Sequence, residues 1–139
     1  MSLLGVFGIS GSGMAAEAQR LSTVASNIAN ANSSVSTGGQ PYRAREVVFR
    51  SVPVTEGDNT AASAGMAGVE VAGVVESATP FRSVYDPGSG FADAQGYVQM
   101  PNVSPVDEMV NMISSQQNYQ ADLDAFNVAK SLALRTLSI

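Results

Sequence analysis

The sequence contains no cysteine and no histidine. Without cysteine it can form neither a disulfide framework nor a thiolate zinc site, and without histidine it lacks the usual metal-binding and general-base side chain. Basic residues are also few, because seven Lys and Arg stand against twelve Asp and Glu, for a net charge of −5. We therefore expect no nucleic-acid partner and no binding to an anionic membrane surface.

Long apolar runs are missing as well. No stretch of the sequence is apolar for long enough to span a bilayer, so no direct membrane insertion is expected. The first residues lack the basic segment of a signal peptide, which predicts that none is cleaved. The length of 139 residues favours one small domain with appendages. The chain is thus expected to stay in the cytosol or to leave the cell by a route without a cleaved signal.

No catalytic, cofactor-binding or metal-binding residues are predicted. The glycine-rich stretch 3–13 lacks the Lys-Ser/Thr pair of a phosphate-binding loop, and no histidine could activate its serines. We expect a helix start or a flexible leader there, whose small residues allow close packing. Asp122 and Asp124 would project from different sides of a helix, and Asp86 and Asp93 fall in predicted turns without a partner base. An enzyme is therefore not indicated.

The longest predicted element is a C-terminal helix over residues 104–139. Ser104 is a good N-cap, and Pro105 fits the first helical position, where its missing N–H is no loss. Asp107 and Glu108 place negative charge at the positive end of the helix dipole. A continuous helix of this length extends about 50 Å. Nothing else in the chain could cover it alone, which indicates an assembly element.

Two sets of residues along this helix predict a coiled-coil seam. The first set recurs every seven residues and the second follows it by four: Met112, Tyr119, Phe126 and Ala133, then Gln116, Leu123, Lys130 and Leu137. Near the helix end, Leu132 and Ile139 project to one side, and Leu134 and Leu137 to nearly the opposite side. A helix that is apolar on all sides is buried on all sides, so a second subunit is expected to cover one of these sides.

A second helix is predicted near the N-terminus. Its apolar stripe follows steps of four and three: Met14, Ala18, Leu21, Ala25 and Ile28. Glu17 and Arg20 form an i, i+3 pair, which we place on the outer surface. Asn27, Asn30 and Asn32 are unusual in a helix, because their side chains compete for the backbone. They mark either a fraying helix end or a row of amides that hydrogen-bonds neighbouring subunits.

The middle of the chain predicts short strands and loops. The expected strands are 42–50, 69–76, 81–85 and 96–100. A linker rich in Ser and Gly precedes them at 34–41, and the stretch 55–68, poor in large apolar residues, predicts a mobile loop.

Two of these strands carry charged residues in alternation with apolar ones. In the second strand, alternation places Glu70 and Glu76 on the face opposite Val69, Val71 and Val75. In the first strand, Arg43 and Arg45 share a face, either as a site for an acidic partner or as an ordinary exposed edge.

The run LSTVASNIANANS, residues 21–33, resembles the N-terminal signature of the bacterial flagellar axial proteins, the group of rod, hook and hook-associated subunits. Residues 41–49 and a later motif resemble the proximal-rod subunits of this family. The later motif consists of Tyr85, Asp86, Pro87, Gly96, Tyr97, Pro101 and Asn102. The resemblance covers nearly the whole chain. Another axial protein is the alternative within the family, whereas a cytosolic coiled-coil adaptor would explain the helices but not these motifs.

The resemblance implies an α+β fold in which N- and C-terminal helices pair as a coiled coil and line a hollow tube. It divides the chain into helical assembly segments 1–34 and 104–139 and a small β-rich domain 35–103 that projects outward. The implied function is a structural subunit of the flagellar proximal rod, the drive shaft that transmits torque. The implied partners are further copies, other rod proteins and the flagellar type III export apparatus, which would deliver the uncleaved chain to the periplasmic rod.

The assembly interface expected from the two helices takes its residues from both ends of the chain. They are Met14, Leu21, Asn27, Ile28, Asn30, Asn32, Met112, Tyr119, Leu123, Phe126, Leu132, Leu134 and Leu137.

Overall fold

A computed structural model describes residues 3–34, 39–53 and 66–138. Two long helices enclose four strands in sequence order: α1 (Leu3–Asn30), β1 (Arg45–Pro53), β2 (Ala67–Glu76), β3 (Arg82–Tyr85), β4 (Tyr97–Met100) and α2 (Pro105–Leu137). The strands form two separate antiparallel pairs, β1 with β2 and β3 with β4. This architecture confirms the predicted α+β class.

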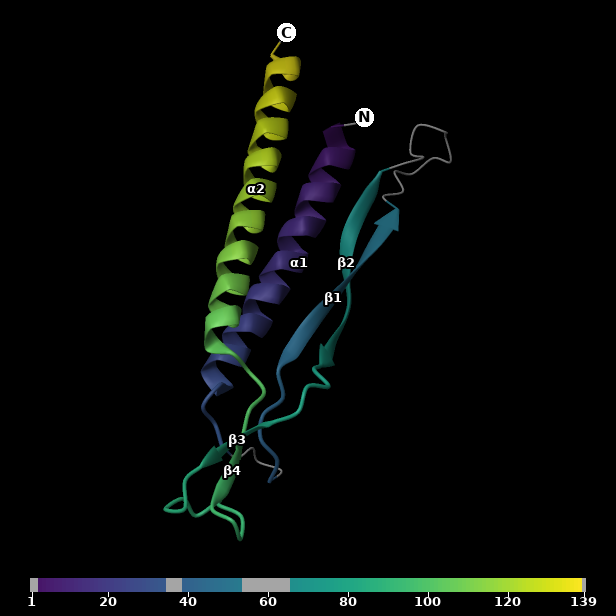
Figure 1. Ribbon diagram of the computed structural model, residues 1–139. Coiled ribbons are helices and arrows are strands. Elements are labelled where there is room, and N and C mark those ends of the chain that lie inside the picture. Colours follow the sequence, from purple (N-terminus) through teal and green to yellow (C-terminus); the bar gives the residue numbers. More distant parts are fainter. Residues whose placement is uncertain (1–2, 35–38, 54–65, 139) are drawn as a thin grey trace.

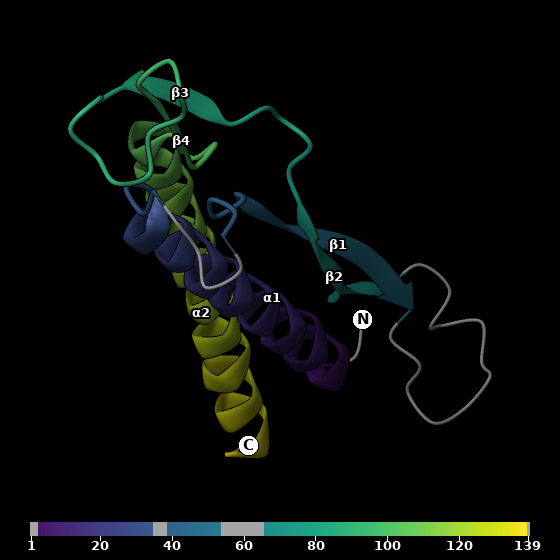
Figure 2. The same cartoon turned by 90° about the horizontal axis from the view of Figure 1, so that it is seen from below.

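The two helices lie side by side, and α1 separates α2 from the β1–β2 pair along its flank (Figure 1). Figure 2 shows from a second direction that α1 and α2 cross at an angle. The β3–β4 pair lies beyond the end where α1 stops and α2 starts, so that α1 begins and α2 ends at the same, opposite end of the molecule (Figure 1).

The start of α2 confirms the predicted cap. The Ser104 hydroxyl accepts a hydrogen bond from the backbone N–H of Asp107 at 3.4 Å, and Pro105 occupies the first turn. Asp107 and Glu108 lie in that turn, where their negative charges interact favourably with the positive end of the helix dipole. The helix then continues to Leu137 without interruption. No helix in the described part of the chain is long and apolar enough to cross a membrane.

The helix α1 begins at Leu3, so the glycine-rich stretch is a helix start rather than a flexible leader. Its small residues do permit close contacts, as expected. A Cβ at Gly5 would lie 3.0 Å from the side chain of Met66, and one at Gly13 would lie 2.5 Å from a carboxylate oxygen of Asp122. Gly5 and Gly13 therefore allow other parts of the chain to approach the α1 backbone.

The buried side of α1 differs from the predicted apolar stripe. Ala18 and Ala25 are exposed, while Met14, Leu21 and Ile28 are only half-buried. The buried positions of α1 are mostly small or polar and include Ser10, Ala16, Glu17, Thr23, Val24 and Asn27. The prediction was wrong here because it followed the large apolar side chains, whereas close packing between neighbouring elements selected small ones.

The β1–β2 pair contains an irregularity that the alternation rule missed. Val48 pairs with Gly73 and Phe49 with Val71, which leaves Ala72 as an extra residue on β2. Such a bulge shifts the alternation of the bulged strand. Val74 and Glu76 therefore share the face of Val69 and Val71, while Val75 joins Glu70 on the other face.

The prediction that Val75 shares a face with Val69 and Val71, away from both glutamates, was wrong for Val75 and Glu76. A bulge cannot be foreseen from alternation alone, because the alternation rule assumes that every residue of both strands is paired.

Strand boundaries otherwise moved by a few residues. The strand predicted at 42–50 begins only at Arg45, and β2 starts at Ala67, inside the predicted loop 55–68. The remainder of that loop, up to residue 65, lies outside the described residues, as do residues 35–38 of the predicted linker.

A small apolar cluster joins the base of the helices to the strands. Ala31, Ala44 and Val103 are buried together, with Tyr42 packed against them. This cluster lies where α1 ends, β1 begins and the chain enters α2. It fixes the relative positions of segments that are far apart in the sequence.

Candidate assembly interface

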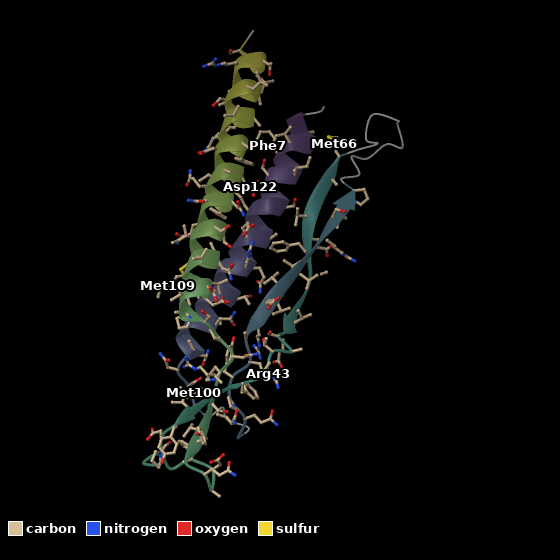
Figure 3. All side chains as sticks on the ribbon, viewed as in Figure 1. Phe7, Arg43, Met66, Met100, Met109 and Asp122 are labelled. Carbon is tan, nitrogen blue, oxygen red and sulfur yellow. The ribbon has the colours of Figure 1, made fainter. Side chains whose placement is uncertain are left out.

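The middle of the α1–α2 contact is lined by small and polar side chains. Ser115 of α2 is 0% exposed, and the Asn118 amide donates a hydrogen bond to Glu17 Oε1 of α1 at 3.1 Å. The Asp122 carboxylate lies against the backbone of Gly13, on the side of α2 that faces α1 (Figure 3). The helices can therefore approach closely, but they bury little apolar surface in this middle part of their contact.

Glu17 is not on the outer surface, where the sequence placed it. It is 8% exposed, and its Oε1 accepts from Asn118 while the Arg20 guanidinium lies 3.9 Å away. The i, i+3 spacing was read correctly, but spacing alone does not say which side of a helix faces a neighbour. The position of α2 decides that.

One of the two predicted sets of seam residues faces α1. Met112, Phe126 and Ala133 are half-buried, while Tyr119 is 36% exposed. The Phe126 ring meets Phe7 edge to face, with 4.9 Å between ring centroids. These rings supply an apolar contact near the free ends of the helices.

The second set is not packed against α1 in the same way. Gln116, Lys130 and Leu137 are exposed, and only Leu123 is half-buried. The residues that complete the α1-facing side follow the first set by three positions instead of four: Ser115, Asp122 and Ala129. Two of them are polar, so a search for apolar repeats passes over them.

The local environment perturbs Asp122. Burial raises the pKa of its carboxyl above the ordinary value of 3.8, and the negative charge of Glu17 raises it further. Ionised Asp122 is therefore disfavoured in the helix pair compared with the unfolded chain.

Asn27 organises the junction of three elements. It is 1% exposed. Its Nδ2 donates to the carbonyl of Arg45 at 2.8 Å and to Glu108 Oε2 at 3.1 Å. Its Oδ1 accepts from the Tyr42 hydroxyl at 2.9 Å and from the Arg45 backbone N–H at 3.0 Å. All four hydrogen-bonding positions of the amide are used within the chain.

The three asparagines therefore differ. Asn30 donates to the carbonyl of Ser26 one turn earlier, at the last residue of α1, and Asn32 is exposed beyond the helix. Burial raises the pKa of the Tyr42 hydroxyl most; Arg45 opposes the rise, and Glu108 with Glu76 adds to it. Tyr42 thus stays a hydrogen-bond donor to the one buried asparagine.

Asn102 holds the same junction from the opposite side. Its Oδ1 accepts from the Ala44 N–H at 2.7 Å, and its Nδ2 donates to the carbonyl of Thr79 at 2.9 Å. The Arg43 guanidinium lies over the Phe81 ring, 4.3 Å from its centroid, and donates to the carbonyl of Ser77 at 3.2 Å. Arg43 therefore joins the segment before β1 to the connection between β2 and β3, rather than lining an open face.

The other residues of the proximal-rod motif meet in the β3–β4 pair. Tyr85 and Tyr97 lie opposite each other with their rings edge to face, 5.3 Å apart. Asp86 accepts from the N–H of Gly88 in the turn that contains Pro87. Gly96 has φ +84°, and a Cβ there would lie 2.9 Å from the Tyr85 ring, so only glycine fits.

Pro101 is almost fully buried directly after β4, between this hairpin and Asn102. The structure thus brings the motif residues together as a structural unit.

The side of α2 that faces away from α1 carries apolar side chains in its first half. Val106, Met109, Val110 and Ile113 are all exposed, Val110 to 61%. Their spacing of three and four places them on one stripe, and Met109 points away from α1 (Figure 3). We call these four residues the outer stripe.

A second exposed group lies toward the C-terminal end of α2, the end that extends past α1 (Figure 1). It consists of Val128, Leu132, Leu134 and Leu137, and we call it the helix tip. Leu137 is 83% exposed, and Leu134 and Leu132 are more than half exposed. Ile139, expected beside Leu132, lies outside the described residues.

Within residues 3–34, 39–53 and 66–138, no group of three or more acidic residues could hold a metal ion. The exposed apolar groups are therefore the candidate surfaces for contact with a partner.

Two family models match the chain. One, described as "Flagella basal body rod protein", matches residues 8–34, and the other, "Flagellar basal body rod FlgEFG protein C-terminal", matches residues 94–139. The two matched ranges hold most of α1, all of α2 and the strand β4.

Curated relatives extend the similarity over the full length. The chain is 48% identical to the flagellar basal-body rod protein FlgC of Escherichia coli O157:H7 and to that of Salmonella typhimurium, over 100% of this chain and 98% of each relative. It is 38% identical to the protein of the same name from Buchnera aphidicola subsp. Acyrthosiphon pisum, with the same coverage.

Proposed function

This chain belongs to the FlgC family of flagellar basal-body rod proteins, structural subunits and not enzymes, and we propose that it joins the rod through the outer surfaces of its terminal helices. In this proposal α1 and α2 pair as a short coiled coil that lines the wall of a hollow tube. The segments 1–34 and 104–139 carry assembly, and residues 35–103 form the β-rich part that faces outward.

The observation that carries the proposal is the exposure of the outer stripe and the helix tip. Eight apolar side chains of one helix meet solvent in the single chain: Val106, Met109, Val110, Ile113, Val128, Leu132, Leu134 and Leu137. A soluble protein rarely leaves so many large apolar groups uncovered on one element unless another molecule covers them. Burying apolar surface between subunits would drive the assembly.

The neighbours in this proposal are further copies of the chain and other rod proteins. The predicted interface residues fall into two groups. Leu132, Leu134 and Leu137 are free to meet a neighbour, whereas Asn27 is fully engaged inside the subunit. We extend the proposal to the route of delivery, through the flagellar type III export apparatus into the periplasmic rod without a cleaved signal. Membership of the family supports this route.

Fractionation of flagellated cells tests the proposal. A tagged copy of the chain that restores swimming should copurify with detergent-extracted basal bodies and resist release by salt. An untagged rod or ring component serves as the loading reference. Recovery of the chain only in the cytoplasmic fraction of swimming cells would contradict the proposal.

A further inference from the structure

A groove runs between the two helices and the β1–β2 pair. It has a volume of about 320 Å³ and is lined by the polar residues Glu17, Asn118 and Asp122 and by Ile9, Gly13, Ala16, Ala121, Phe49 and Val69. Two carboxylates thus share a space whose remaining walls are mainly apolar.

Only one of the two oxygens of the Glu17 carboxylate accepts a hydrogen bond among the described residues. Its Oε1 accepts from Asn118, and the Arg20 guanidinium lies 3.9 Å from that same oxygen. Its Oε2 is buried and has no hydrogen-bond partner among the described residues. An unpaired charged oxygen out of contact with water is costly, and a second carboxylate beside it adds repulsion. A positive charge from outside the subunit would therefore stabilise the two carboxylates of the groove.

The chemistry of the groove selects the kind of cation. A lysine or arginine carries its charge at the end of an aliphatic stem, and such stems pack along apolar surface while the charged end meets a carboxylate. Phe49, Val69 and Ile9 offer that apolar surface next to Glu17 and Asp122. A bare metal ion would instead need several oxygen ligands, and the groove presents two carboxylates and one amide.

The chain itself carries basic side chains that lack a partner. Arg20, Arg45 and Arg50 each lie beside a glutamate. In the described part of the structure, three basic side chains have neither an ion pair nor a hydrogen bond: Arg82 on β3, and Lys130 and Arg135 on α2. Of these, only Lys130 and Arg135 lie among the exposed apolar residues of the helix tip, near the C-terminal end of α2.

We propose that the groove around Glu17 and Asp122 is the docking site for the basic helix tip of a second copy of this chain, with Lys130 or Arg135 supplying the positive charge. This inference rests on the proposed function, because it assigns one contact within the rod. The helix tip brings both required elements, apolar side chains for the walls and an ammonium or guanidinium for the carboxylates. The contact is heterologous, so it propagates from copy to copy rather than closing a dimer.

Neutralising the groove tests the docking site. Glu17→Gln and Asp122→Asn, separately, should reduce the amount of chain in purified basal bodies at least tenfold, relative to the amount exported. Asp124→Asn is the matched control, because Asp124 is an exposed carboxylate on α2 that bonds to Gln120, and it should assemble as the wild type does. Equal incorporation of the groove variants and the wild type would overturn the proposal.

The source of the charge is tested by combining variants. Lys130→Gln or Arg135→Gln should reduce incorporation alone. The one that supplies the charge should add nothing when combined with Asp122→Asn, because both changes remove the same contact. Additive losses for both combinations, or normal incorporation of both single variants, would overturn the assignment to a second copy.

Two controls separate docking from other causes. The purified Asp122→Asn chain should be at least as helical by circular dichroism as the wild type, since it loses a disfavoured charge. A less helical variant would show a role in folding and overturn the proposal. A helicity increase on adding Mg²⁺ or Ca²⁺ that Asp122→Asn abolishes would show a metal site instead. If wild-type chain is absent from basal bodies, the proposed function fails, whereas assembly of wild type and variants alike contradicts only the docking site.

Discussion

The two sides of α2 have opposite characters. In its middle, the side that meets α1 carries the polar residues Ser115, Asn118 and Asp122, of which Ser115 is completely buried. Larger apolar contacts on this side are confined to residues such as Met112 and Phe126 on either side of the polar part. The side turned away carries the outer stripe, which remains exposed. An ordinary amphipathic helix of a soluble protein has the reverse arrangement, with apolar groups inside and polar groups in water.

This inversion indicates how the free energy of burial is distributed. In the middle of the α1–α2 contact, small and polar side chains allow close approach and specific hydrogen bonds but contribute little apolar burial. The larger apolar groups of the outer stripe and the helix tip are exposed in the single subunit and, in the proposed rod, are buried by neighbouring subunits. We therefore expect the subunit alone to be only marginally stable and the assembled rod to be much more stable.

The largest expected effect comes from a charge placed on the outer stripe or on the helix tip. Val110→Asp and, separately, Leu132→Asp and Leu134→Asp should each reduce recovery in basal bodies by a hundredfold or more. An unpaired charge buried in an interface costs several kcal/mol, and about 1.4 kcal/mol corresponds to a factor of ten. Leu132→Met is the control, because it keeps an apolar side chain of similar size. Normal assembly of any aspartate variant would show that its side chain stays in water, and the comparison would break for that side of the helix.

On the polar side, Asn27→Ala should destabilise the subunit by about 2–4 kcal/mol. It strands the Arg45 N–H, the Tyr42 hydroxyl and one oxygen of Glu108, and each buried unsatisfied group costs about 1–3 kcal/mol. Asn30→Ala removes only a bond to the Ser26 carbonyl in the same helix and is the control. Swimming at rising temperature measures the difference. A temperature limit no lower for Asn27→Ala than for Asn30→Ala would mean that the network does not hold the junction.

A change outside both helices sharpens the comparison. Gly96→Ala should destabilise the β3–β4 hairpin by about 1–2 kcal/mol, because φ +84° is unfavourable for alanine and the new Cβ meets the Tyr85 ring. Gly90→Ala, with open space around it, should change little. Limited proteolysis between residues 85 and 97 reports the loss. Equal cleavage of both variants would exclude strain at Gly96 as the reason for the glycine.

The smallest effect is a pH dependence of the polar side. Burial raises the pKa of Asp122 in the folded state, so the stability that its neutral form contributes is fully present below the unfolded pKa and is lost as pH rises through the folded pKa. Acidifying the purified chain from neutral pH toward pH 4 should therefore favour the paired helices. Asp122→Asn should remove this part of the dependence, and Asp124→Asn should retain it. Identical pH profiles of helicity for wild type and Asp122→Asn would contradict this assignment.

The elements of the fold could be predicted from the sequence where a local rule decides them. The α2 start follows from Ser104 and Pro105, and the β3–β4 hairpin follows from its turn residues. The family also follows from motifs at both ends of the chain, and the comparisons confirm it.

Features that depend on three-dimensional contacts were beyond such rules. Glu17 and Ser115 are buried because two helices meet at glycine and serine positions, and polar residues carry no periodic apolar signal. The extra residue at Ala72 reverses the faces of β2, which an alternating pattern cannot show. Asn27 was recognised as unusual, but only the structure shows that its four hydrogen bonds stay within the subunit.

Cysteine labelling tests the inversion of α2 most directly, because the natural chain contains no cysteine that could react in the background. Single cysteines replace Val110 on the outer stripe and Ser115 on the side facing α1, and maleimide labelling is measured in the purified subunit and in isolated basal bodies. Labelling in denaturant defines the maximum. We predict that the cysteine at position 110 reacts in the purified subunit and is protected in basal bodies. In the purified subunit, the cysteine at position 115 should react less than the cysteine at position 110. Equal reactivity of position 110 in the subunit and in basal bodies would contradict the claim that the outer stripe is buried by assembly.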